Sequence, residues 1–259
     1  MKKLFVLGTG PGDLELLTPK AKQAIIASTD LVAYGLYIDI MGDLCAGKTR
    51  HDMALGEEIN RARLALDLAA QGRDTALVSS GDIGIYAMAT LVFELLDRQL
   101  QGLEDSPHWL EVEIEVIPGI SAMQAGASAV GAMLGHDFCT ISLSDLLTPW
   151  QSIKKRIECA AAGDFVVSFY NPVSKKRDWQ LNTARDILLT CRPVNTPVMI
   201  GRQLTRPEQH IKIIELQDLD AKDVDMFTMV SVGNSDSRRI VNGTKEWVYT
   251  PRGYSKKLS

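Results

Sequence analysis

Hydrophobic positions recur along the chain at two periods, which predict strands and helices in alternation. Short apolar runs bounded by turn residues have the length of buried strands, and longer segments carry apolar residues at helical spacing. In the first half we expect strands at residues 5–7, 31–34, 75–79 and 111–117, and helices at residues 19–27, 57–70 and 85–100. This alternation predicts an α/β fold with a mostly parallel sheet covered by helices.

The second half starts the pattern again, which predicts a second α/β domain. Turns rather than long helices separate its last three strands, so this sheet should be mixed. The strands are expected at residues 139–143, 165–170, 197–200, 210–216 and 227–232, and the helices at residues 150–161 and 178–189. We therefore expect an N-terminal α/β domain at residues 1–118, a C-terminal α/β domain at residues 119–248 and a tail at residues 249–259.

A segment of small residues at 122–133 follows the junction, with Ser121 as its cap. A helix rich in alanine, glycine and serine can pack very close to a neighbour, and it can equally leave room for a ligand. Both interpretations remain open at this point.

The first predicted strand runs into a turn with three glycines, Gly8, Gly10 and Gly12, which Asp13 closes. Glycine has no β-carbon, so such a turn brings backbone close to a ligand. A dinucleotide is disfavoured, because the third glycine of its fingerprint falls at Asp13 and no helix opens at once. The acidic residue that the fingerprint needs has one candidate, Asp30, which precedes its strand instead of following it. A tight turn without a ligand is the alternative.

A literal Walker A match begins at Gly42 and ends at Lys48 and Thr49. A P-loop follows a buried strand and opens a long helix at its lysine. Here no helical pattern appears until about residue 56, and no apolar run ending in aspartate follows to hold magnesium. The match therefore does not predict a nucleotide site.

Two further polar turns follow predicted strands. Ser80, Gly81 and Asp82 come after the strand at 75–79, and Asn171 comes after the strand at 165–170. Ligands of open α/β sheets bind at such carboxyl ends of strands. Asp82 can accept from ligand hydroxyls or cap the following helix, and the two roles are compatible.

The composition of the chain argues against several classes of function. The 259 residues carry a formal net charge of −4 and are 46% hydrophobic, which is ordinary for a globular protein and gives no general basic surface for nucleic acid or membrane. No apolar run approaches a membrane span, and the N-terminal run is too short for a signal peptide. The four cysteines and four histidines show no metal-ligand spacing. We expect reduced, mostly buried thiols in a cytoplasmic protein without a metal.

Basic clusters stand out against this negative net charge. Lys175, Lys176 and Arg177 follow the turn at Asn171, and Arg202 lies near another strand end. Most runs of lysine and arginine are solvated helix faces, and that is our interpretation of residues 154–156. The clusters at strand ends are compatible with a small polyanionic substrate, whose carboxylates pair with cations. No nucleophile can be argued from spacing, which favours a reaction whose reactive group arrives on a cofactor.

The turns, in this order and spacing, resemble those of the tetrapyrrole methyltransferase family, which uses S-adenosylmethionine (SAM). The resemblance covers essentially the whole chain and rests on GTGPGD at 8–13, SGD at 80–82, IPGISA at 117–122 and FYN at 169–171. Other stretches are similar to the precorrin-3B or cobalt-precorrin-3 C17-methyltransferases of cobalamin biosynthesis: HDFC at 136–139, ISLSDLLTPW at 141–150, YNP at 170–172, DM at 225–226 and VGNS at 232–235. One departure is Ile83, where the family often has proline, so the local turn can differ.

The resemblance implies two α/β domains with the active site in the cleft between them, and a homodimer. It implies methyl transfer from SAM to C17 of a polycarboxylate tetrapyrrole, precorrin-3B or its cobalt form, coupled to ring contraction and giving S-adenosylhomocysteine as product. By position, the implied cofactor-binding residues are Gly10, Pro11, Ser80, Gly81, Asp82, Ile85, Ser121, Ala122, Asn171, Leu204 and Thr228. The basic residues Lys175, Lys176, Arg177 and Arg202 are candidates for binding the substrate carboxylates.

We expect catalysis to consist mostly of positioning. Ring contraction also needs proton movement, which favours a general acid or base. Asp13, Asp39, His136 and Asp145 are the candidates, and for each a purely structural role is the alternative. Two other functions remain open: a methyltransferase of the same pathway that acts at another ring carbon, and a corrinoid-binding protein without activity.

Overall fold

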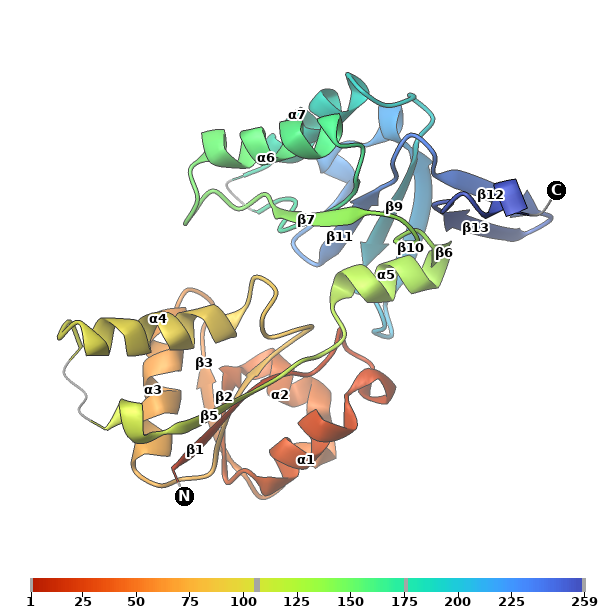
Figure 1. The fold of residues 1–259 in the computed structure, drawn as a ribbon. Coiled ribbons are helices and arrows are strands. Elements are labelled where there is room, and N and C mark those ends of the chain that lie inside the picture. Colours follow the sequence, from red (N-terminus) through yellow and green to blue (C-terminus); the bar gives the residue numbers. More distant parts are fainter. Residues whose placement is uncertain (1, 105–107, 175–176, 258–259) are drawn as a thin grey trace. The chain divides into compact units, whose positions relative to one another are not determined.

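The computed structural model describes residues 2–104, 108–174 and 177–257. The chain forms two compact units, Met1–Ser121 and Ala122–Ser259, which follow one another in the colours of Figure 1. Each unit combines a five-stranded sheet with helices and has its own buried hydrophobic clusters. This confirms the α/β class that the sequence predicts.

The sheet of the first unit has the strand order β3-β2-β4-β1-β5, and every neighbouring pair is parallel. Its strands are β1 (Lys3–Gly8), β2 (Asp30–Tyr34), β3 (Thr49–Met53), β4 (Thr75–Ser79) and β5 (Glu113–Ile117). Because all five run in one direction, their carboxyl ends lie along one edge, which we call the carboxyl edge. The turns that follow β1, β4 and β5 are neighbours there.

Helices cover both faces of this sheet because successive strand residues point to opposite sides. Leu4 and Val6 belong to the core with α3 and α4, whereas Leu7 belongs to the core with α1 and α2. Figure 1 shows these two helix pairs. The four helices are α1 (Pro19–Ala27), α2 (Gly35–Met41), α3 (Glu58–Ala70) and α4 (Met88–Leu100).

Local sequence explains where several of these elements begin. The Thr18 hydroxyl accepts from the amide of Ala21, and Pro19 occupies the first turn, so α1 starts where it was predicted. Helix α4 starts at Met88 and not at residue 85 as predicted, because Tyr86 has a φ of +52° and interrupts the helix. The edge strand β3 and the short helix α2 were not predicted.

The sheet of the second unit has the strand order β10-β9-β11-β8-β7. Strands β7 and β8 are parallel, whereas β11 runs antiparallel to β8 and β9, and β10 antiparallel to β9, which confirms the predicted mixed sheet. The strands are β7 (Phe138–Ser142), β8 (Val166–Tyr170), β9 (Pro197–Arg202), β10 (His210–Glu215) and β11 (Thr228–Val232). A smaller sheet joins β6 (Gly131–Ala132), β12 (Arg238–Asn242) and β13 (Lys245–Tyr249).

Helices α6 (Trp150–Ala162) and α7 (Gln180–Leu189) pack on one face of this sheet, and α5 (Ala122–Val130) packs on the other. A β-carbon at Gly126 of α5 would lie 2.5 Å from the methyl carbon of Met199 and 3.2 Å from a methyl of Leu204. Of the two interpretations of the small-residue segment, close packing is therefore the correct one at this position. Short 3₁₀ helices complete the fold at Leu14–Leu16, Gly42–Cys45, Trp109–Glu111, Leu216–Asp218, Ala221–Asp223 and Tyr254–Lys257.

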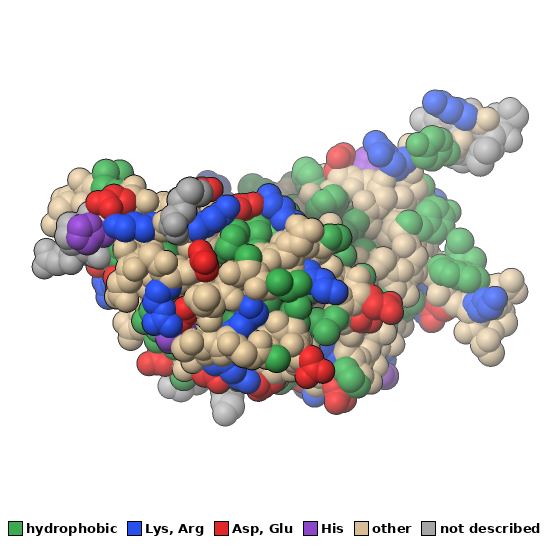
Figure 2. Space-filling view, turned by 90° about the horizontal axis from the view of Figure 1, so that it is seen from below, with side chains coloured by type: hydrophobic (Ala, Val, Ile, Leu, Met, Phe, Trp, Pro, Cys, Tyr) green, Lys and Arg blue, Asp and Glu red, His purple; other side chains and the backbone are tan. Residues whose placement is uncertain are grey.

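The surface corrects one expectation. Cys159 and Cys191 are exposed, so the prediction of mostly buried cysteines is wrong for these two, because the core-facing residues of α6 are others and Cys191 lies in the turn after α7. Acidic and basic side chains are interspersed on the face shown in Figure 2. Within the described ranges, no helix has the length and apolarity for a membrane crossing, and no cluster of three or more suitable side chains could hold a metal ion.

Candidate functional site

The turns after β1 and β4 are hydrogen-bonded to each other. The Gly10 amide donates to the Gly81 carbonyl at 3.1 Å, and the Gly81 amide donates back to the Gly10 carbonyl at 2.7 Å. The Ser80 hydroxyl lies 3.3 Å from the same Gly10 carbonyl, to which it donates. Gly10 and Gly81 have φ values of +79° and +70°, which glycine adopts without strain. The turns after β1 and β4 are therefore joined through their backbones.

The third turn, which follows β5, packs against these two turns. A β-carbon at Gly119 would lie 2.2 Å from the Gly81 carbonyl oxygen, and one at Gly8 would lie 2.4 Å from the same atom. These distances are far below contact distance, so only glycine fits at residues 8 and 119. The carbonyl of residue 81 is thus enclosed by the ends of β1 and β5.

Asp82 links the second turn to the third. Its Oδ1 accepts from the Gly84 amide at 2.8 Å, and its Oδ2 accepts from the Gly119 amide at 3.1 Å. The carboxylate does not cap α4, whose N-cap residue is Ala87 and has no side-chain cap. The capping role is therefore wrong, and the structure gives Asp82 the role of joining two turns of the carboxyl edge.

Space for a ligand remains beside these turns. The position of a β-carbon on Gly81 has no atom within 4 Å, although the carbonyl on the other side is tightly packed. Ile85 is half-buried and follows Asp82 in the turn before α4. A ligand can therefore approach the backbone of residue 81 at van der Waals distance, which fits the sequence-based hypothesis that this turn binds a cofactor through its backbone.

Asp13 has a structural contact of its own. Its Oδ1 accepts from the Glu15 amide at 2.8 Å and so caps the 3₁₀ helix that follows the first turn. The neighbouring Thr9 hydroxyl donates to the Ser79 carbonyl, which ties the turn to β4. Pro11 lies between the two, in the turn itself.

The second unit also gathers candidate residues at one edge of its sheet. Strands β7, β8 and β9 run in the same direction, because β11 is antiparallel to both β8 and β9. Their carboxyl ends therefore lie together with the start of β11. Asn171 follows β8, Leu204 follows β9, and Thr228 begins β11, so three predicted cofactor residues share this carboxyl edge.

The start of α5 lies at the same edge. The Tyr170 hydroxyl lies 3.4 Å from the Met123 amide nitrogen, which donates to it, and so ties the first turn of α5 to the end of β8. Ala122, the first residue of α5, is half-buried. Ser121 is the last residue of the first unit and is buried.

A hydrogen-bond network supports Asn171, which has a φ of +50°. Its side-chain amide donates to the Ser142 hydroxyl, while its backbone carbonyl accepts from Arg177 at 2.6 Å. Arg177 also donates to the Leu143 carbonyl and is buried, and burial lowers the pKa of its guanidinium despite the opposing effect of Asp145. This guanidinium therefore holds the turn at Asn171 in place. The other two candidates of the cluster, Lys175 and Lys176, lie outside the described residues.

Asp145 belongs to the same network. Its Oδ2 accepts from the Gln180 amide at 3.1 Å, and its Oδ1 lies 3.7 Å from Nε of Arg177. Between this anchored carboxylate and Trp150, the loop exposes 87% of Leu146 and 98% of Leu147. Two consecutive leucines that are almost fully exposed are unusual on a protein surface.

Leu204 lies in a strained turn. The residues on either side, Gln203 and Thr205, have φ values of +48° and +63° although neither is glycine. Such strain of about 1–3 kcal/mol per residue is concentrated at functional sites. Leu204 itself is buried against Gly126 and Gly201.

Arg202 and Thr228 both bind Asp225. Its Oδ2 accepts from Arg202 at 2.6 Å, and its Oδ1 accepts from the Thr228 hydroxyl at 2.7 Å. Burial opposes ionisation of this carboxyl, but these hydrogen bonds together hold its pKa below the ordinary value. Arg202 remains partly exposed beside the fixed carboxylate, at the carboxyl edge of the second unit.

Within the second unit, the two candidate acids or bases are not brought together. His136 precedes β7 and Asp145 follows it, so these two lie at opposite ends of one strand. His136 is largely exposed and contacts its neighbour Asp137. Asp13 belongs to the other unit, where Asp39 pairs with Arg50 at 2.8 Å.

The Walker A match does not form a P-loop, as expected. Gly42–Cys45 is a 3₁₀ helix, and the lysine precedes the strand β3 instead of opening a helix. Lys48 donates to the carbonyls of Ile26 and Ser28 at 3.0 and 2.6 Å, at the end of α1. Cations are favourable at this end of a helix, which explains the lysine without a nucleotide.

Sequence reasoning missed three residues that hold the turns in place: Gly119, Asp225 and Gln180. Gly119 carried a signal, since it follows a predicted strand as Gly8 and Gly81 do. Asp225 stands in the stretch DM at 225–226 that carries the resemblance, without a sign of its partners, and Gln180 gave no signal, because its partner Asp145 lies 35 residues away in a loop whose path depends on the folded sheet.

Comparison with known proteins identifies a family for this chain. Residues 3–220 match the family model described as Tetrapyrrole (Corrin/Porphyrin) Methylases. The chain is 40% identical over 253 residues to a Sinorhizobium protein named precorrin-3B C(17)-methyltransferase, with 97% of each chain covered. It is also 40% identical over 252 residues to a Salmonella typhimurium protein named probable cobalt-factor III C(17)-methyltransferase, with 97% of this chain and 99% of that one covered.

Solved structures share the fold. The crystal structure of the methyltransferase CobJ matches with a TM-score of 0.87 and 41% identity, over 96% of this chain and 99% of that one. A Thermus thermophilus uroporphyrin-III C-methyl transferase, complexed with S-adenosylhomocysteine, matches in fold with a TM-score of 0.64 and 20% identity, over 89% and 97% of the two chains. With the family model matched over most of its length and full-length relatives at 40% identity, the chain belongs to the tetrapyrrole (corrin/porphyrin) methylases.

Proposed function

We propose that the chain is a SAM-dependent methyltransferase of cobalamin biosynthesis, which methylates C17 of precorrin-3B or its cobalt form and contracts the ring. The observation that carries this proposal is the 40% identity, over 97% of the chain, to a protein named precorrin-3B C(17)-methyltransferase. The second relative, named for cobalt-factor III, supports the same ring position and leaves the metal content of the substrate as an experimental variable.

The residues of the first unit fit a cofactor that is recognised by backbone. The space beside Gly81 is open and leaves its backbone accessible to a ligand, while Gly8 and Gly119 pack tightly against its carbonyl. We assign Gly10, Pro11, Ser80, Gly81, Asp82 and Ile85 to cofactor binding, with Ser121, Ala122, Asn171, Leu204 and Thr228 as further contacts. The relative in fold that is complexed with S-adenosylhomocysteine supports this cofactor.

Bound SAM supplies a methyl group on a positively charged sulfur, so the protein needs no nucleophile of its own. The chain has to align the partners and exclude water, which can account for roughly 7–11 kcal/mol of the barrier. The mutual hydrogen bonds of Gly10 and Gly81 hold the two turns in a fixed relative position for this alignment, and Asp82 joins the second turn to the third.

Ring contraction also requires a proton to be moved. Asp13 and Asp145 follow strands at the carboxyl edges of their units, and we propose these two as candidate general acids or bases. His136 precedes β7, at the end of the strand opposite to Asp145, and is not assigned a catalytic role. Arg202, fixed by Asp225 and partly exposed, is the described cation that we assign to a substrate carboxylate.

The test is methyl transfer with an identified product. The purified chain is incubated with methyl-labelled SAM and either precorrin-3B or its cobalt form, and the methylated carbon is located by NMR. We expect label at C17 and a contracted ring. Label at another carbon would favour a different methyltransferase of the pathway, and corrinoid binding without transfer would favour a non-catalytic protein.

Two controls make this test specific. Calorimetry should show micromolar or tighter binding of SAM and S-adenosylhomocysteine and none of NADH or ATP, since tight binding of NADH alone would restore the dinucleotide interpretation. The resemblance further supports a cytoplasmic homodimer, which light scattering after gel filtration tests independently of activity.

A further inference from the structure

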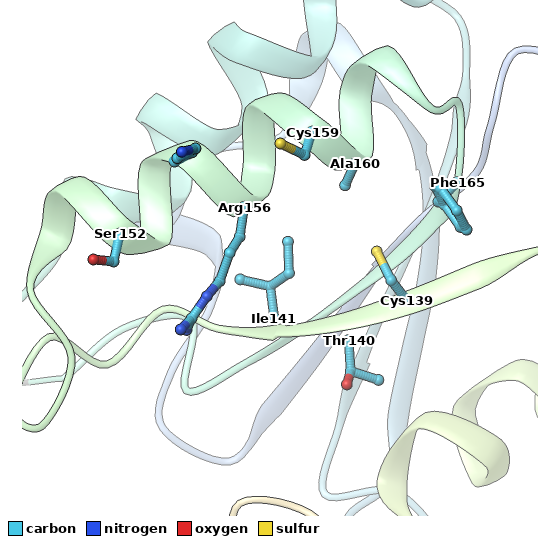
Figure 3. A pocket seen from close by; sticks show the side chains of 9 residues that line it. Cys139, Thr140, Ile141, Ser152, Arg156, Cys159, Ala160 and Phe165 are labelled. Carbon is cyan, nitrogen blue, oxygen red and sulfur yellow. The ribbon is translucent and has the colours of Figure 1, made fainter.

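The second unit contains a groove that the proposed methyl transfer does not use. It lies between the edge strand β7 and helix α6 and has a volume of about 520 Å³, within the range of small-molecule sites. Its lining residues, shown in Figure 3, are Cys139, Thr140, Ile141, Ser152, Lys155, Arg156, Cys159, Ala160 and Phe165. None of these is among the residues assigned to the cofactor or to the substrate.

The floor of the groove is apolar. Ile141 and Ala160 are buried in the core of the second unit, and Phe165 is 36% exposed at the end of the groove. Figure 3 shows Cys139 and Ile141 pointing from β7 toward α6, with Thr140 pointing away. A ligand that fills this groove therefore gains by covering carbon and sulfur surface.

The rim carries two cations. Lys155 and Arg156 have no carboxylate partner among the residues that the structure describes, whereas the neighbouring Lys154 lies 3.7 Å from Glu158. In Figure 3 the Arg156 side chain extends from α6 toward the strand. Asp164, next to Phe165, is already bound by Ser235 through its amide and hydroxyl. The nearby acids thus leave these two cations available for an anion.

We propose that this groove binds an amphipathic carboxylate, a small molecule with an apolar body for the floor and an anionic group for Lys155 and Arg156. A second copy of the chain fits the groove less well, because a twofold interface would bring the same two cations face to face. The proposal does not depend on the proposed methyl transfer, since none of the lining residues takes part in it.

The cysteines of the chain provide the assay. Cys159 is exposed and lines the groove, while Cys191 is exposed and does not line it. Burial raises the pKa of the Cys139 thiol, so this residue reacts slowly despite the proximity of Arg192. Alkylation of Cys159 by iodoacetamide, followed by mass spectrometry, therefore reports occupancy of the groove, and Cys191 is the internal control.

Decanoate and uroporphyrin III are the two probes, because aliphatic acids and polycarboxylate tetrapyrroles share the proposed chemistry. At twice its dissociation constant, a bound probe should slow alkylation of Cys159 about threefold and leave Cys191 unchanged. Protection by one probe alone identifies the source of the ligand. No protection by either, or equal protection by decanol, would overturn the proposal.

The cations are tested with a matched control. Replacing both Lys155→Gln and Arg156→Gln should weaken the protecting carboxylate roughly tenfold, from the loss of two exposed ion pairs. Lys154→Gln removes a cation from the same helix outside the groove and should leave protection unchanged. An equal loss in both variants would mean that general charge, and not the groove, attracts the anion.

Discussion

The carbonyl oxygen of Gly81 lies 2.2 Å from the position that a β-carbon of Gly119 would occupy. The two residues follow strands β4 and β5, which flank β1 on either side. Residue 119 must therefore be glycine, because a β-carbon there would clash with this carbonyl. Residue 81 favours glycine because of its φ of +70°, and the volume beside it is open. The two positions should respond differently to the same substitution.

Gly119→Ala should destabilise the fold. The added methyl must displace backbone, which costs about 1–3 kcal/mol or more in the free energy of unfolding. Urea denaturation followed by circular dichroism measures this change. Gly81→Ala places its methyl in open space and should cost only about 1 kcal/mol, for the left-handed conformation. Equal losses in the two variants would contradict the packing described here.

Gly81→Val should abolish SAM binding while the protein remains folded, because the side chain fills the space proposed for the cofactor. Calorimetry with S-adenosylhomocysteine measures the loss. Gly72→Val is the matched control, since Gly72 also has a positive φ of +86° and an open β-carbon position, but lies after α3 away from the turns. Unchanged binding in Gly81→Val would remove the first unit's turns from the cofactor site.

Asp82→Asn should weaken cofactor binding more than it weakens the fold. The amide has one acceptor oxygen for two backbone donors, so either Gly84 or Gly119 faces an NH₂ group and loses its partner. Losing a hydrogen bond to a charged group costs about 1.5–3 kcal/mol, and the turn that carries Gly81 should move with it. The ratio of the change in affinity to the change in melting temperature distinguishes this from general destabilisation.

The buried Asp30 predicts a pH dependence of stability. Burial works against its ionisation, but hydrogen bonds from His51, Thr29 and Arg73 hold the pKa of its carboxyl below the ordinary value. A depressed folded-state pKa gives stability that is present above the unfolded-state pKa and lost as the pH falls through the folded-state value. Stability should therefore decline below about pH 4.

Asp30→Asn tests this assignment. The variant loses the hydrogen bonds of the charged Asp30 to Arg73 and His51, and because such bonds are worth about 1.5–3 kcal/mol, it should be less stable at neutral pH and should show a flatter stability profile in the acid range. Asp43→Asn, at an exposed position of the 3₁₀ helix Gly42–Cys45, is the control. A variant profile parallel to that of the parent chain would place the acid sensitivity elsewhere.

The exposed leucines at the carboxyl edge of the second unit predict an effect on substrate binding alone. Replacing Leu146→Ser and Leu147→Ser removes no buried contact, so the melting temperature and the affinity for SAM should not change. If these side chains cover the apolar macrocycle, KM for the tetrapyrrole should rise roughly tenfold. An unchanged KM would show that the loop serves another purpose.

Much of the fold could be predicted, because buried elements have periodic sequences. Helix α1 and strand β4 begin and end at the predicted residues, because β4 is buried along its whole length and α1 buries Ala21, Ala24 and Ile25 at helical spacing after its cap. Strand β3 was missed because an edge strand of the sequence TRHDM buries too little to show a pattern. The hairpin β12–β13 was missed for the same reason, since most of its residues are exposed.

The site could be predicted only as a set of separate turns. The glycines and Asp82 indicate that something approaches the backbone, but the sequence does not indicate that Gly81 bonds to Gly10 across about 70 residues. Arg177 belongs to a basic cluster that suggests substrate binding, yet its side chain is buried and donates to two backbone carbonyls. These carbonyls belong to the residues directly after β7 and β8, which only the fold brings close. Such roles depend on tertiary contacts that no local pattern contains.

The strand order of the first unit determines when its three turns can assemble during synthesis. Strand β1 is made first, but its two neighbours, β4 and β5, begin about 70 and 110 residues later, and Gly119 is the last residue of the three turns to be made. A nascent chain released before β5 would expose an open edge of β1, and one released before Gly119 would lack the amide that binds Asp82. The three turns can therefore assemble only after residue 119 has been synthesised, so this edge of the sheet should be among the last parts of the first unit to form.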